Sequence, residues 1–520
     1  MKKIILFALI LCCSLQAKAQ GSEAQMQLRK LQLAEAAISR FYVDSVKEGQ
    51  LVETAIKAML KELDPHSTYS NAEEVKKLNE PLEGSFEGIG ISYNFVEDTL
   101  MVIQPVMRGP SERVGIQASD RIIAVNDSCI AGVGFTQDDA RRVLRGPRGS
   151  QVRLDVLRPG VKDILKFTVT RDKIPVKALN AAYLTVSGIG YIQFDSFGKN
   201  THREMMDAIE ELEKEGMESL IIDLQGNTGG YLDSAIDIAN EFLNAEEPIV
   251  YTEGRASKRH EFRANGRGTL KNIPLTILVD QESASAAEIL AGAIQDNDRG
   301  TIIGRRTYGK GLVQRPVELL DGSMIRLTIA RYYTPTGRCI QKPYVKGKKE
   351  DYSMDLLHRI QSGELYNEDS VKLDKTLAYQ TLKDKRTVYG GGGIMPDFFV
   401  PIDTTQYTRY HNQLAATSAI TKATLKYIDR HREELTQKYP KFNDFFAHYE
   451  VGQDLLDMLI AEGKAQKVEF NEEEYKKGLP EIKLQLKALL ARDLWDTSEY
   501  FQIMNTINPV VKKAIEMMEE

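Results

Sequence analysis

The stretch Asn272–Gln314 constrains the fold of this chain most strongly. It begins with NIPLTILVD, an apolar run with β-branched residues that ends at Asp280 and predicts a buried strand. QESASAAEILAGAIQDN follows, with apolar residues at the spacing of a helix. Upstream, the strand Ser219–Leu224, a glycine loop and the helix Tyr231–Leu243 repeat this order. Strand and helix alternate in this way through Gly304, which predicts an α/β layer.

Chemically useful side chains lie in and just after this stretch. Ser285 stands in the Ser-Ala-Ser-Ala sequence where the predicted strand turns into the predicted helix. Lys310 lies between Gly309 and Gly311, and Gln314 follows. A hydroxyl at a helix N-terminus and a lysine on a tight loop are the parts of a Ser/Lys nucleophile.

Four rival candidates are weaker. The chain has no Gly-x-Ser-x-Gly elbow of a Ser-His-Asp enzyme. The Ser-x-x-Lys pair at Ser196 and Lys199 lies in a glycine turn rather than inside a helix. His66, in LDPHSTYS, fits a turn histidine that bonds to local backbone. Ser283 fits a residue that caps the helix.

The glycine loop Gln225–Gly230 has two chemical interpretations. A strand, a glycine loop and a helix can bind phosphate, but both Gly-x-Gly-x-x-Gly and Gly-x4-Gly-Lys-Ser/Thr are absent. The other interpretation is that its amides point at a developing oxyanion. Ala286, at the predicted helix start, would then supply one N–H, and Gly229 or Gly230 the other.

The N-terminus predicts export. Lys2 and Lys3 precede the apolar run Ile4–Leu15, and Ala17-Lys18-Ala19 forms a small-x-small cleavage site, so residues 1–19 read as a signal peptide. An uncleaved anchor stays open as the alternative. The mature protein is expected to be periplasmic or secreted, with no membrane span.

Composition narrows the remaining classes of function. The net charge of −6 is spread along the 520 residues without a basic tract, which argues against a nucleic-acid partner. After cleavage only Cys129 and Cys339 remain, and neither Cys-x-x-Cys nor a histidine cluster indicates a metal. We expect two half-buried free thiols, with one disulfide as the alternative, and neither metal nor cofactor.

Residues 81–172 change to short strands and glycine turns. Phe86-Glu87-Gly88-Ile89-Gly90-Ile91, followed in order by Pro110-Ser111, Gly115-Ile116 and Asp120-Arg121-Ile122, resembles a PDZ domain. The resemblance implies that the backbone of Gly88, Ile89, Gly90 and Ile91 binds the C-terminal carboxylate of a peptide, because glycines let successive N–H groups point at one anion. Arg145 is a candidate for sensing the bound tail.

The stretch around Ser285 resembles a known family. SASAAEI, the Tyr308-Gly309-Lys310-Gly311 loop and Gln314 are similar to the carboxy-terminal processing (tail-specific) proteases of the S41 serine peptidase family. Lys310 follows Ser285 by 25 positions (310 − 285) and Gln314 follows it by 29 (314 − 285), as in that family. DLQGNTGG, RYYTPTGRCIQKPY, GGGGIMPD and LDPHSTY are also similar. The chain departs from the family at Ala287 and at Gln225-Gly226, which puts the side-chain contacts of the glycine loop in doubt.

The resemblance implies a role for each residue and a fold. Ser285 would be the nucleophile, Lys310 the general base and Gln314 the residue that orients the base. The implied fold is an α/β crotonase-like (ClpP/crotonase-type) protease core with an inserted PDZ domain and helical N- and C-terminal regions. The domains expected are an N-terminal helical region (20–80), the PDZ domain (81–172), the core (173–403, with an exposed polar insertion at 344–376) and a C-terminal helical region (404–520).

The implied activity is that of an exported serine endopeptidase that recognises the C-terminal tails of protein substrates. A homo-oligomer or an activating partner protein stays open. The alternatives are a non-catalytic PDZ adaptor or scaffold with a degenerate core, and an acyl-transfer or hydratase enzyme on the same kind of α/β core. The presence of Ser285, Lys310 and Gln314 together argues against the adaptor, and the PDZ-like insert argues against the acyl-transfer enzyme.

Overall fold

The computed structural model describes residues 23–403, 405 and 407–520. The predicted signal peptide, Met1–Ala19, lies outside the described residues. The chain divides into two compact units. The smaller contains residues up to Ala72 together with Gln314–Thr328 and Tyr344–Ser353, and the larger contains Glu73–Val313, Ile329–Pro343 and Met354–Glu520.

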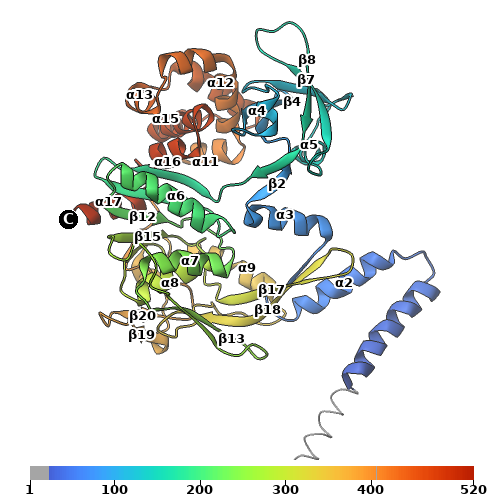
Figure 1. The fold of residues 1–520 in the computed structure, drawn as a ribbon, viewed down its shortest axis with the longest axis vertical. Helices are drawn as coiled ribbons and strands as arrows, with labels where there is room; N and C mark the ends of the chain where they lie inside the picture. Colours follow the sequence, from blue (N-terminus) through green and yellow to red (C-terminus); the bar gives the residue numbers. More distant parts are fainter. Residues whose placement is uncertain (1–22, 404, 406) are drawn as a thin grey trace, which may run out of the picture. The chain divides into compact units, whose positions relative to one another are not determined.

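The larger unit contains a six-stranded sheet with the order β10-β11-β12-β15-β16-β21 (Figure 1). β10 and β11 form the antiparallel hairpin expected near residues 181–194, and the other neighbours are parallel. The strands are β10 (Leu179–Leu184), β11 (Ile189–Phe194), β12 (Ser219–Asp223), β15 (Leu275–Val279), β16 (Thr301–Gly304) and β21 (Phe398–Phe399). The strand–helix alternation of the sequence therefore forms the predicted α/β layer.

Helices pack on both faces of this sheet. The faces alternate along each strand, so neighbouring residues such as Ile221 and Ile222 enter different apolar clusters. One face packs against α6 (Thr201–Lys214), α7 (Leu232–Phe242) and α8 (Ala286–Asp296), and the other against α17 (Pro509–Glu519). β15 is buried along its whole length, as expected for a strand that is covered on both faces.

The topology brings the serine turn and the glycine loop to one edge of the sheet. β12 and β15 are parallel neighbours, with Asp223 paired to Leu278. Gln225–Gly230 follows β12, and Ser285 follows β15. Because parallel strands end at the same edge, the two loops lie side by side, at the edge where open α/β sheets bind their ligands.

A PDZ-like module precedes this sheet in the larger unit. Its strands are antiparallel, in the order β3-β4-β5-β7-β8 with β6 beside β5, so β3 is an edge strand. The elements are β3 (Ile91–Val96), β4 (Thr99–Pro105), α4 (Pro110–Arg113), β5 (Arg121–Val125), β6 (Ser128–Cys129), α5 (Gln137–Leu144), β7 (Gln151–Leu157) and β8 (Leu165–Thr170). The paired strands β2 (Ser85–Gly88) and β9 (Asp172–Pro175) connect it to the rest of the chain.

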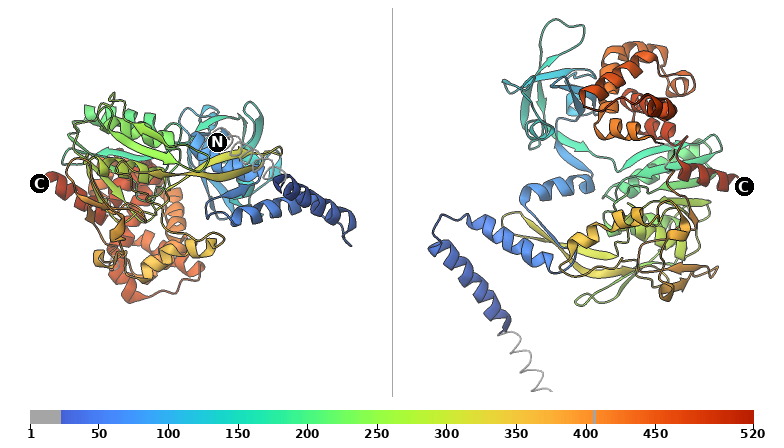
Figure 2. Two further views of the ribbon diagram at one scale, coloured as in Figure 1. Left: turned by 90° about the horizontal axis from the view of Figure 1, so that it is seen from below. Right: turned by 180° about the vertical axis from the view of Figure 1, so that it is seen from behind.

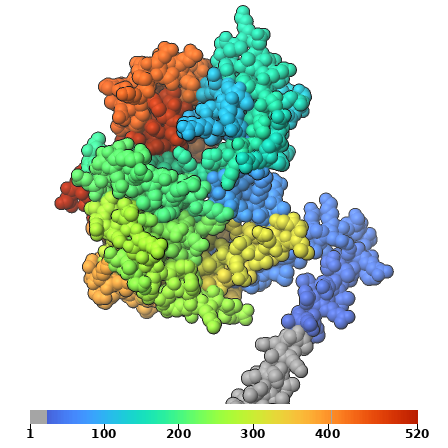
Figure 3. All heavy atoms as spheres, viewed as in Figure 1, coloured from blue at the N-terminus to red at the C-terminus, as the bar shows by residue number. Residues whose placement is uncertain are grey.

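The predicted C-terminal helical region is confirmed from Arg409 onward. Its helices are α11 (Arg409–Ala416), α12 (Ala419–Lys438), α13 (Phe442–His448), α14 (Gln453–Ala465), α15 (Glu472–Leu494), α16 (Thr497–Met504) and α17. The helices α11 to α16 enclose a separate apolar core that includes Phe445, Leu455 and Leu486, whereas α17 packs on the sheet. These orange helices adjoin the cyan PDZ-like module in the view from behind and in the space-filling view (Figures 2 and 3).

The remaining elements of the larger unit are shorter. β13 (Pro248–Glu253) pairs with β14 (His260–Arg263) and with the Arg331–Tyr333 end of β18 (Met324–Tyr333). The others are α3 (Ala72–Glu83), α10 (Asp355–Gln361), the 3-10 turns Glu368–Ser370 and Lys375–Leu377, and the hairpin of β19 (Ala378–Gln380) and β20 (Thr387–Tyr389). β17 (Leu312–Glu318) begins in this unit and ends in the smaller one.

In the smaller unit, the predicted helical character of the N-terminal region is confirmed. The structure has a helix at 23–41 and a second one, α2 (Glu48–Lys61), with a break at 42–47. The predicted apolar face stays exposed: Leu33 is 65% exposed and Phe41 77%. Periodicity predicts a helix face but not what covers it. The unit also contains α9 (Lys349–Ser353) and β1 (Thr68–Ser70), which pairs with Met324–Arg326 of β18.

The expectation that residues 344–376 form an exposed polar insertion is wrong in part. The segment contains α9 and α10, and Tyr352, Arg359 and Leu365 in it are buried. Arg359 binds the carboxylate of Glu364 at 2.7 Å and donates to the carbonyl oxygens of Thr307 and Arg306. Charged residues such as Arg359 and Glu364 make this segment polar in sequence, but in the structure they form buried ion pairs. Arg359 also packs against the loop that contains Lys310, which we call the lysine loop.

Two further expectations concern the surface. Among the described residues, no helix is long and apolar enough to cross a membrane. Cys129 and Cys339 are both free thiols, but Cys129 is exposed rather than half-buried.

A buried carboxyl lies at the end of β12. Asp223 is 2% exposed, accepts a hydrogen bond from the Tyr191 hydroxyl at 2.6 Å, and accepts two from the backbone and side-chain amides of Gln225. Burial raises the pKa of Asp223 to about 6, and the three hydrogen bonds oppose that rise. Gln225 stands where the S41 pattern usually has another residue, and its side chain here bonds to this carboxyl.

Asp223→Asn should change how stability depends on pH. The native carboxyl stays protonated between about pH 4 and pH 6 while the unfolded one ionises, so the wild type loses unfolding free energy as the pH rises, by up to about 3 kcal/mol. The variant has no titrating group at this position, so its unfolding free energy does not fall in this way as the pH rises. Its unfolding midpoint should therefore improve relative to wild type from pH 4.5 to pH 7, and a difference that does not vary with pH would contradict the raised pKa.

Candidate active site

The turn at Ser285 has an unusual backbone. Ser285 lies between β15 and α8 with φ 58° and ψ −114°, a combination that residues with a side chain rarely adopt. In α/β-hydrolases a sharp strand-to-helix turn exposes the serine hydroxyl in a similar way. Such strain persists only where the surroundings impose it, and the surroundings of Ser285 do so.

Glu288 is the centre of those surroundings. Its buried carboxylate accepts hydrogen bonds from the amides of Ser285 at 2.9 Å, Gly309 at 2.7 Å and Lys310 at 2.8 Å, and from the Thr307 hydroxyl at 2.6 Å. Burial raises the pKa of the Glu288 carboxyl, and the four donors oppose the rise. One side chain thus fixes the backbone of Ser285 relative to that of Lys310.

Tyr332 completes the connection from the carbonyl side. Its hydroxyl lies 3.0 Å from the carbonyl oxygen of Ser285 and 2.5 Å from that of Lys310, and the residue is buried. We call Glu288 and Tyr332 the clamp. The residue types of Ser285 and Lys310 drew attention in the sequence, whereas the clamp did not. Glu288 could have been recognised in the sequence, because a glutamate three residues after a serine that begins a helix matches the capping-box pattern.

The glycine loop packs directly on the serine turn. At Gly229, where φ is +100°, an added Cβ would lie 2.7 Å from the Ser285 Cβ and 3.0 Å from the Ala286 nitrogen. The Gly229 amide donates to the Asn227 side chain at 2.9 Å, so it is occupied. The amides of Gly230 and Ala286 have no hydrogen bond within the part of the chain that the structure describes. Of the two glycine amides named from sequence, that of Gly229 is occupied and that of Gly230 has no partner among the described residues.

Ser283 does not cap α8 as expected. It is buried, its hydroxyl donates to the Leu224 carbonyl oxygen at 2.7 Å, and it accepts from the Asp280 amide at 2.9 Å. These bonds join the turn after β12 to the turn after β15. The Ser283 hydroxyl therefore has a structural role, because it connects these two turns.

The other rivals also have structural partners. The His66 ring bonds to the Tyr352 hydroxyl at 2.8 Å rather than to local backbone. Lys199 of the Ser-x-x-Lys pair binds Glu83. Neither arrangement contains a serine with an adjacent base.

Gln314 belongs to the smaller unit, whereas Ser285 and Lys310 belong to the larger one. Its side-chain amide donates to the backbone carbonyl oxygen of His66. The LDPHSTY segment, flagged in the sequence only by its resemblance, therefore holds the Gln314 side chain.

The predicted carboxylate-binding loop joins β2 to β3. Gly90 has φ +72°, and the Ile89 carbonyl oxygen accepts hydrogen bonds from both the amide and the hydroxyl of Ser111. The amides of Ile89 and Gly90 have no hydrogen bond to any described residue. Ile91 begins the edge strand β3. The loop thus has the free donors and the adjoining strand edge that peptide-tail binding needs.

Arg145 lies beside this loop. Its guanidinium pairs with Glu80 of α3 and lies 4.2 Å from the ring centre of Phe86. The stem of the side chain packs against Gly88. The arginine is therefore close to the loop, as predicted, but its charge is paired with a glutamate of the same chain.

No group of three or more histidine, cysteine or carboxylate side chains among the described residues could hold a metal ion.

Known families match four parts of the chain. Residues 188–354 match peptidase family S41, and 101–158 match a PDZ domain. Residues 12–74 match the "activating protease CtpB N-terminal domain", and 410–496 match a family of unknown function. The carboxy-terminal processing protease CtpB of Bacillus subtilis is 35% identical over 64% of this chain and 70% of its own length. This chain belongs to the S41 family of carboxy-terminal processing serine proteases.

Other relatives are similar to this protease. The carboxyl-terminal-processing protease of Synechocystis sp. is 38% identical over 56% of this chain and 68% of its own. Among solved structures, the photosystem II D1 C-terminal processing protease is 29% identical with a TM-score of 0.34, over 59% of this chain and 88% of that one. The prediction of an S41 protease with a PDZ domain is confirmed.

Glu288→Gln should lower the turnover of this protease. The variant replaces one acceptor oxygen by an NH2 group that faces N–H donors, and a hydrogen bond to a charged group contributes about 1.5–3 kcal/mol, so kcat should fall about 10- to 100-fold. KM should change much less, since the substrate does not touch a buried carboxylate. Steady-state kinetics on one peptide substrate measures both constants.

Glu282→Gln is the matched control. It makes the same change six positions earlier in the chain, at an exposed residue, and should keep wild-type kcat. Equal kcat values for the two folded variants would show that Glu288 does not position the site.

Proposed function

We propose that this protease is a serine endopeptidase of the Ser/Lys type, built on a crotonase-like core. Ser285 is the nucleophile, Lys310 the general base and Gln314 the residue that orients the base. The observation that carries this proposal is the clamp, which fixes the strained Ser285 turn to the Lys310 backbone at 2.9 and 2.8 Å through one carboxylate. A serine that only caps α8 would need neither the strained backbone nor a carboxylate that also binds the amides of Gly309 and Lys310.

The catalytic steps follow from these groups. The neutral Lys310 amine takes the Ser285 proton as the hydroxyl oxygen attacks the peptide carbonyl carbon. The amides of Ala286 and Gly230 donate to the tetrahedral oxyanion, and the N-terminus of α8 adds its dipole. The protonated lysine then gives its proton to the leaving amine. The Lys310 amine then deprotonates a water molecule, which attacks the carbonyl carbon of the acyl-enzyme. The ester bond to Ser285 breaks, and the protonated lysine returns its proton to the Ser285 oxygen.

The PDZ-like module is proposed to bind the C-terminal tail of the substrate. A terminal carboxylate on the Gly88–Ile91 loop would receive the free amides of Ile89 and Gly90, and the preceding residues would pair with the edge of β3. Arg145 lies next to that loop, so the arriving carboxylate would compete with Glu80 for its guanidinium. This competition is how the protein would sense a bound tail.

Variants of the two reacting side chains test the proposal. Ser285→Ala and Lys310→Arg should each reduce cleavage of an unfolded protein with an apolar C-terminus by about 10⁴-fold or more, because a dyad works as one unit. Lys310→Arg keeps a long basic side chain but removes the base, because a guanidinium stays protonated. Lys346→Arg, a lysine outside the site, serves as control. Retained activity in either site variant would overturn the dyad.

Export of the protein is supported by Lys2, Lys3 and the apolar run that follows them. The purified protein from a cell that exports it should have the intact mass of a chain that begins at Gln20. A mass that includes Met1 or Lys2 would contradict a cleaved signal peptide.

A further inference from the structure

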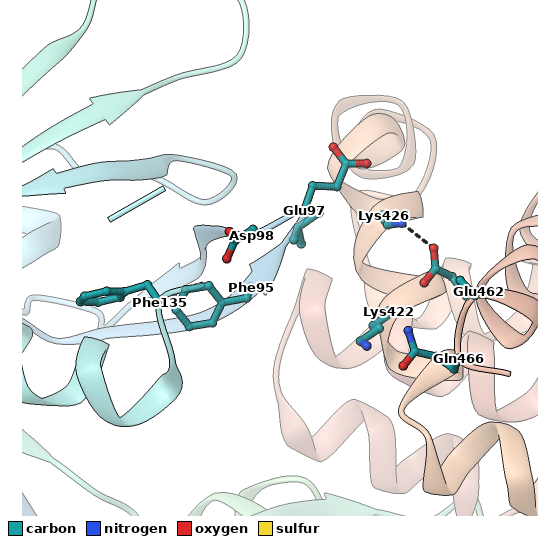
Figure 4. A pocket seen from close by; sticks show the side chains of 10 residues that line it. Phe95, Glu97, Asp98, Phe135, Lys422, Lys426, Glu462 and Gln466 are labelled. Carbon is teal, nitrogen blue, oxygen red and sulfur yellow. Dashed lines mark hydrogen bonds and ion pairs between the residues drawn. The ribbon is translucent and has the colours of Figure 1, made fainter. Parts of the chain in front are cut away.

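A cavity lies between the PDZ-like module and the C-terminal helical region, both within the larger unit. Its volume is about 460 Å³. The PDZ-like wall comes from the end of β3, the β3–β4 turn and Phe135, and the helical wall from α12 and α14 (Figure 4). No role in the Ser285 chemistry involves this space.

The cavity lies at the Val96 end of β3, the strand along which the proposed tail would pair. We call the path of that tail the groove; it would run between β3 and α5, which are joined by a hydrogen bond from the Tyr93 hydroxyl to the Gln137 carbonyl oxygen at 3.4 Å. A tail that pairs antiparallel with β3 begins at the loop before Ile91 and runs toward Val96. At about 3.3 Å per residue, a side chain about five to seven positions before the terminus reaches the cavity.

The two walls of the cavity are attached to each other. Arg121 of the PDZ-like module pairs with Asp429 of α12 at 2.7 Å. Leu425 of α12 is buried in one apolar cluster with Val96, Met101 and Ile103 of β3 and β4. α12 is therefore a built part of the groove's end and not a chance neighbour.

The helical wall carries an uncompensated positive charge. Lys426 pairs with Glu462, but the half-buried Lys422 has no ion pair or side-chain hydrogen bond among the described residues. The side-chain amide of Gln466 lies beside Lys422 (Figure 4) and is also half-buried. It too has no side-chain hydrogen bond among the described residues. Both side chains can donate hydrogen bonds, and a partly desolvated ammonium is stabilised by an anion.

The acids on the opposite wall do not satisfy this lysine. Glu97 and Asp98 are exposed on the tight turn after β3, and Asp98 accepts from the Gly134 amide at 3.0 Å. Phe95 and Phe135 belong to the same wall as these acids and offer apolar surface (Figure 4). The cavity therefore has aromatic rings on its PDZ-like wall and Lys422 on its helical wall.

We propose that the C-terminal helical region forms the far end of the substrate-tail site. It would bind a carboxylate side chain, Asp or Glu, about five to seven residues before the substrate's C-terminus through Lys422 and Gln466. This specificity rests on the proposed tail docking and adds a requirement to it. The apolar tail end is recognised by the PDZ-like module, and the acidic residue upstream by helices outside that module.

Peptide binding to the full-length Ser285→Ala variant tests the proposal. Ten-residue peptides with one apolar tail carry Glu, Gln or Lys at each of the fifth, sixth and seventh positions before the terminus, and fluorescence anisotropy gives Kd at physiological salt. At one position the Glu peptide should bind about five-fold more tightly than the Gln peptide, as expected for a partly buried ion pair.

Second substitutions assign the effect to the cavity. Lys422→Gln should abolish the preference for Glu without changing the Kd of the Gln peptide, and Lys422→Glu should favour the Lys peptide. Lys464→Gln makes the same charge change on α14 at an exposed residue outside the cavity, and should keep the preference. A preference that survives in Lys422→Gln would overturn the assignment.

An amidated set separates this proposal from tail docking itself. If peptides with a free carboxylate bind better than amidated ones but show no preference at the three upstream positions, the tail docking stands and the role of the helices is wrong. If amidation changes nothing, tail docking by the PDZ-like module fails. An upstream preference without carboxylate dependence would also contradict the combined site.

Discussion

The site depends on one buried carboxylate. Glu288 accepts four hydrogen bonds, from the Ser285, Gly309 and Lys310 amides and from the Thr307 hydroxyl. A buried carboxylate is costly unless donors surround it, and buried donors are costly unless they have an acceptor. Each therefore requires the other. The strained backbone at Ser285 persists because releasing it would break this network.

The same carboxylate explains why distant segments matter. Thr307, which donates to Glu288, also accepts from the Ile394 amide in the GGGGIMPD segment at 2.7 Å. Arg359 donates to the carbonyl oxygens of Arg306 and Thr307 from the segment expected to be an exposed insertion. The lysine loop is thus fixed from both sides by chain that is remote in sequence. Ser283 supports the serine turn in the same way through Leu224 and Asp280.

The sequence predicted what depends on local pattern. The central strands and α6, α7 and α8 follow from apolar periodicity, and Ser285 and Lys310 from residue type and spacing. Tyr332 was not predicted, because a tyrosine in a strand gives no sign of which carbonyl groups it will reach. The occupied amide of Gly229 was also not predictable, since it depends on the side chain of Asn227. The exposed face at 23–41 had the pattern of a buried one, and pattern alone does not supply a partner.

A buried lysine near Lys310 bears on the choice of the proposed base. Lys342 lies beside the same loop, and its amide donates to the Gly309 carbonyl oxygen at 2.9 Å. Burial lowers the pKa of its ammonium, which is the property a general base needs. However, that nitrogen binds Asp355 at 2.9 Å, lies 3.8 Å from the centre of the Tyr308 ring, and belongs to a residue that is 5% exposed. A lysine held in this way cannot receive a proton from a hydroxyl at a substrate-accessible turn. Burial alone therefore does not identify a base, whereas the hydrogen bonds of Glu288 include the backbone of Lys310, the base that we propose.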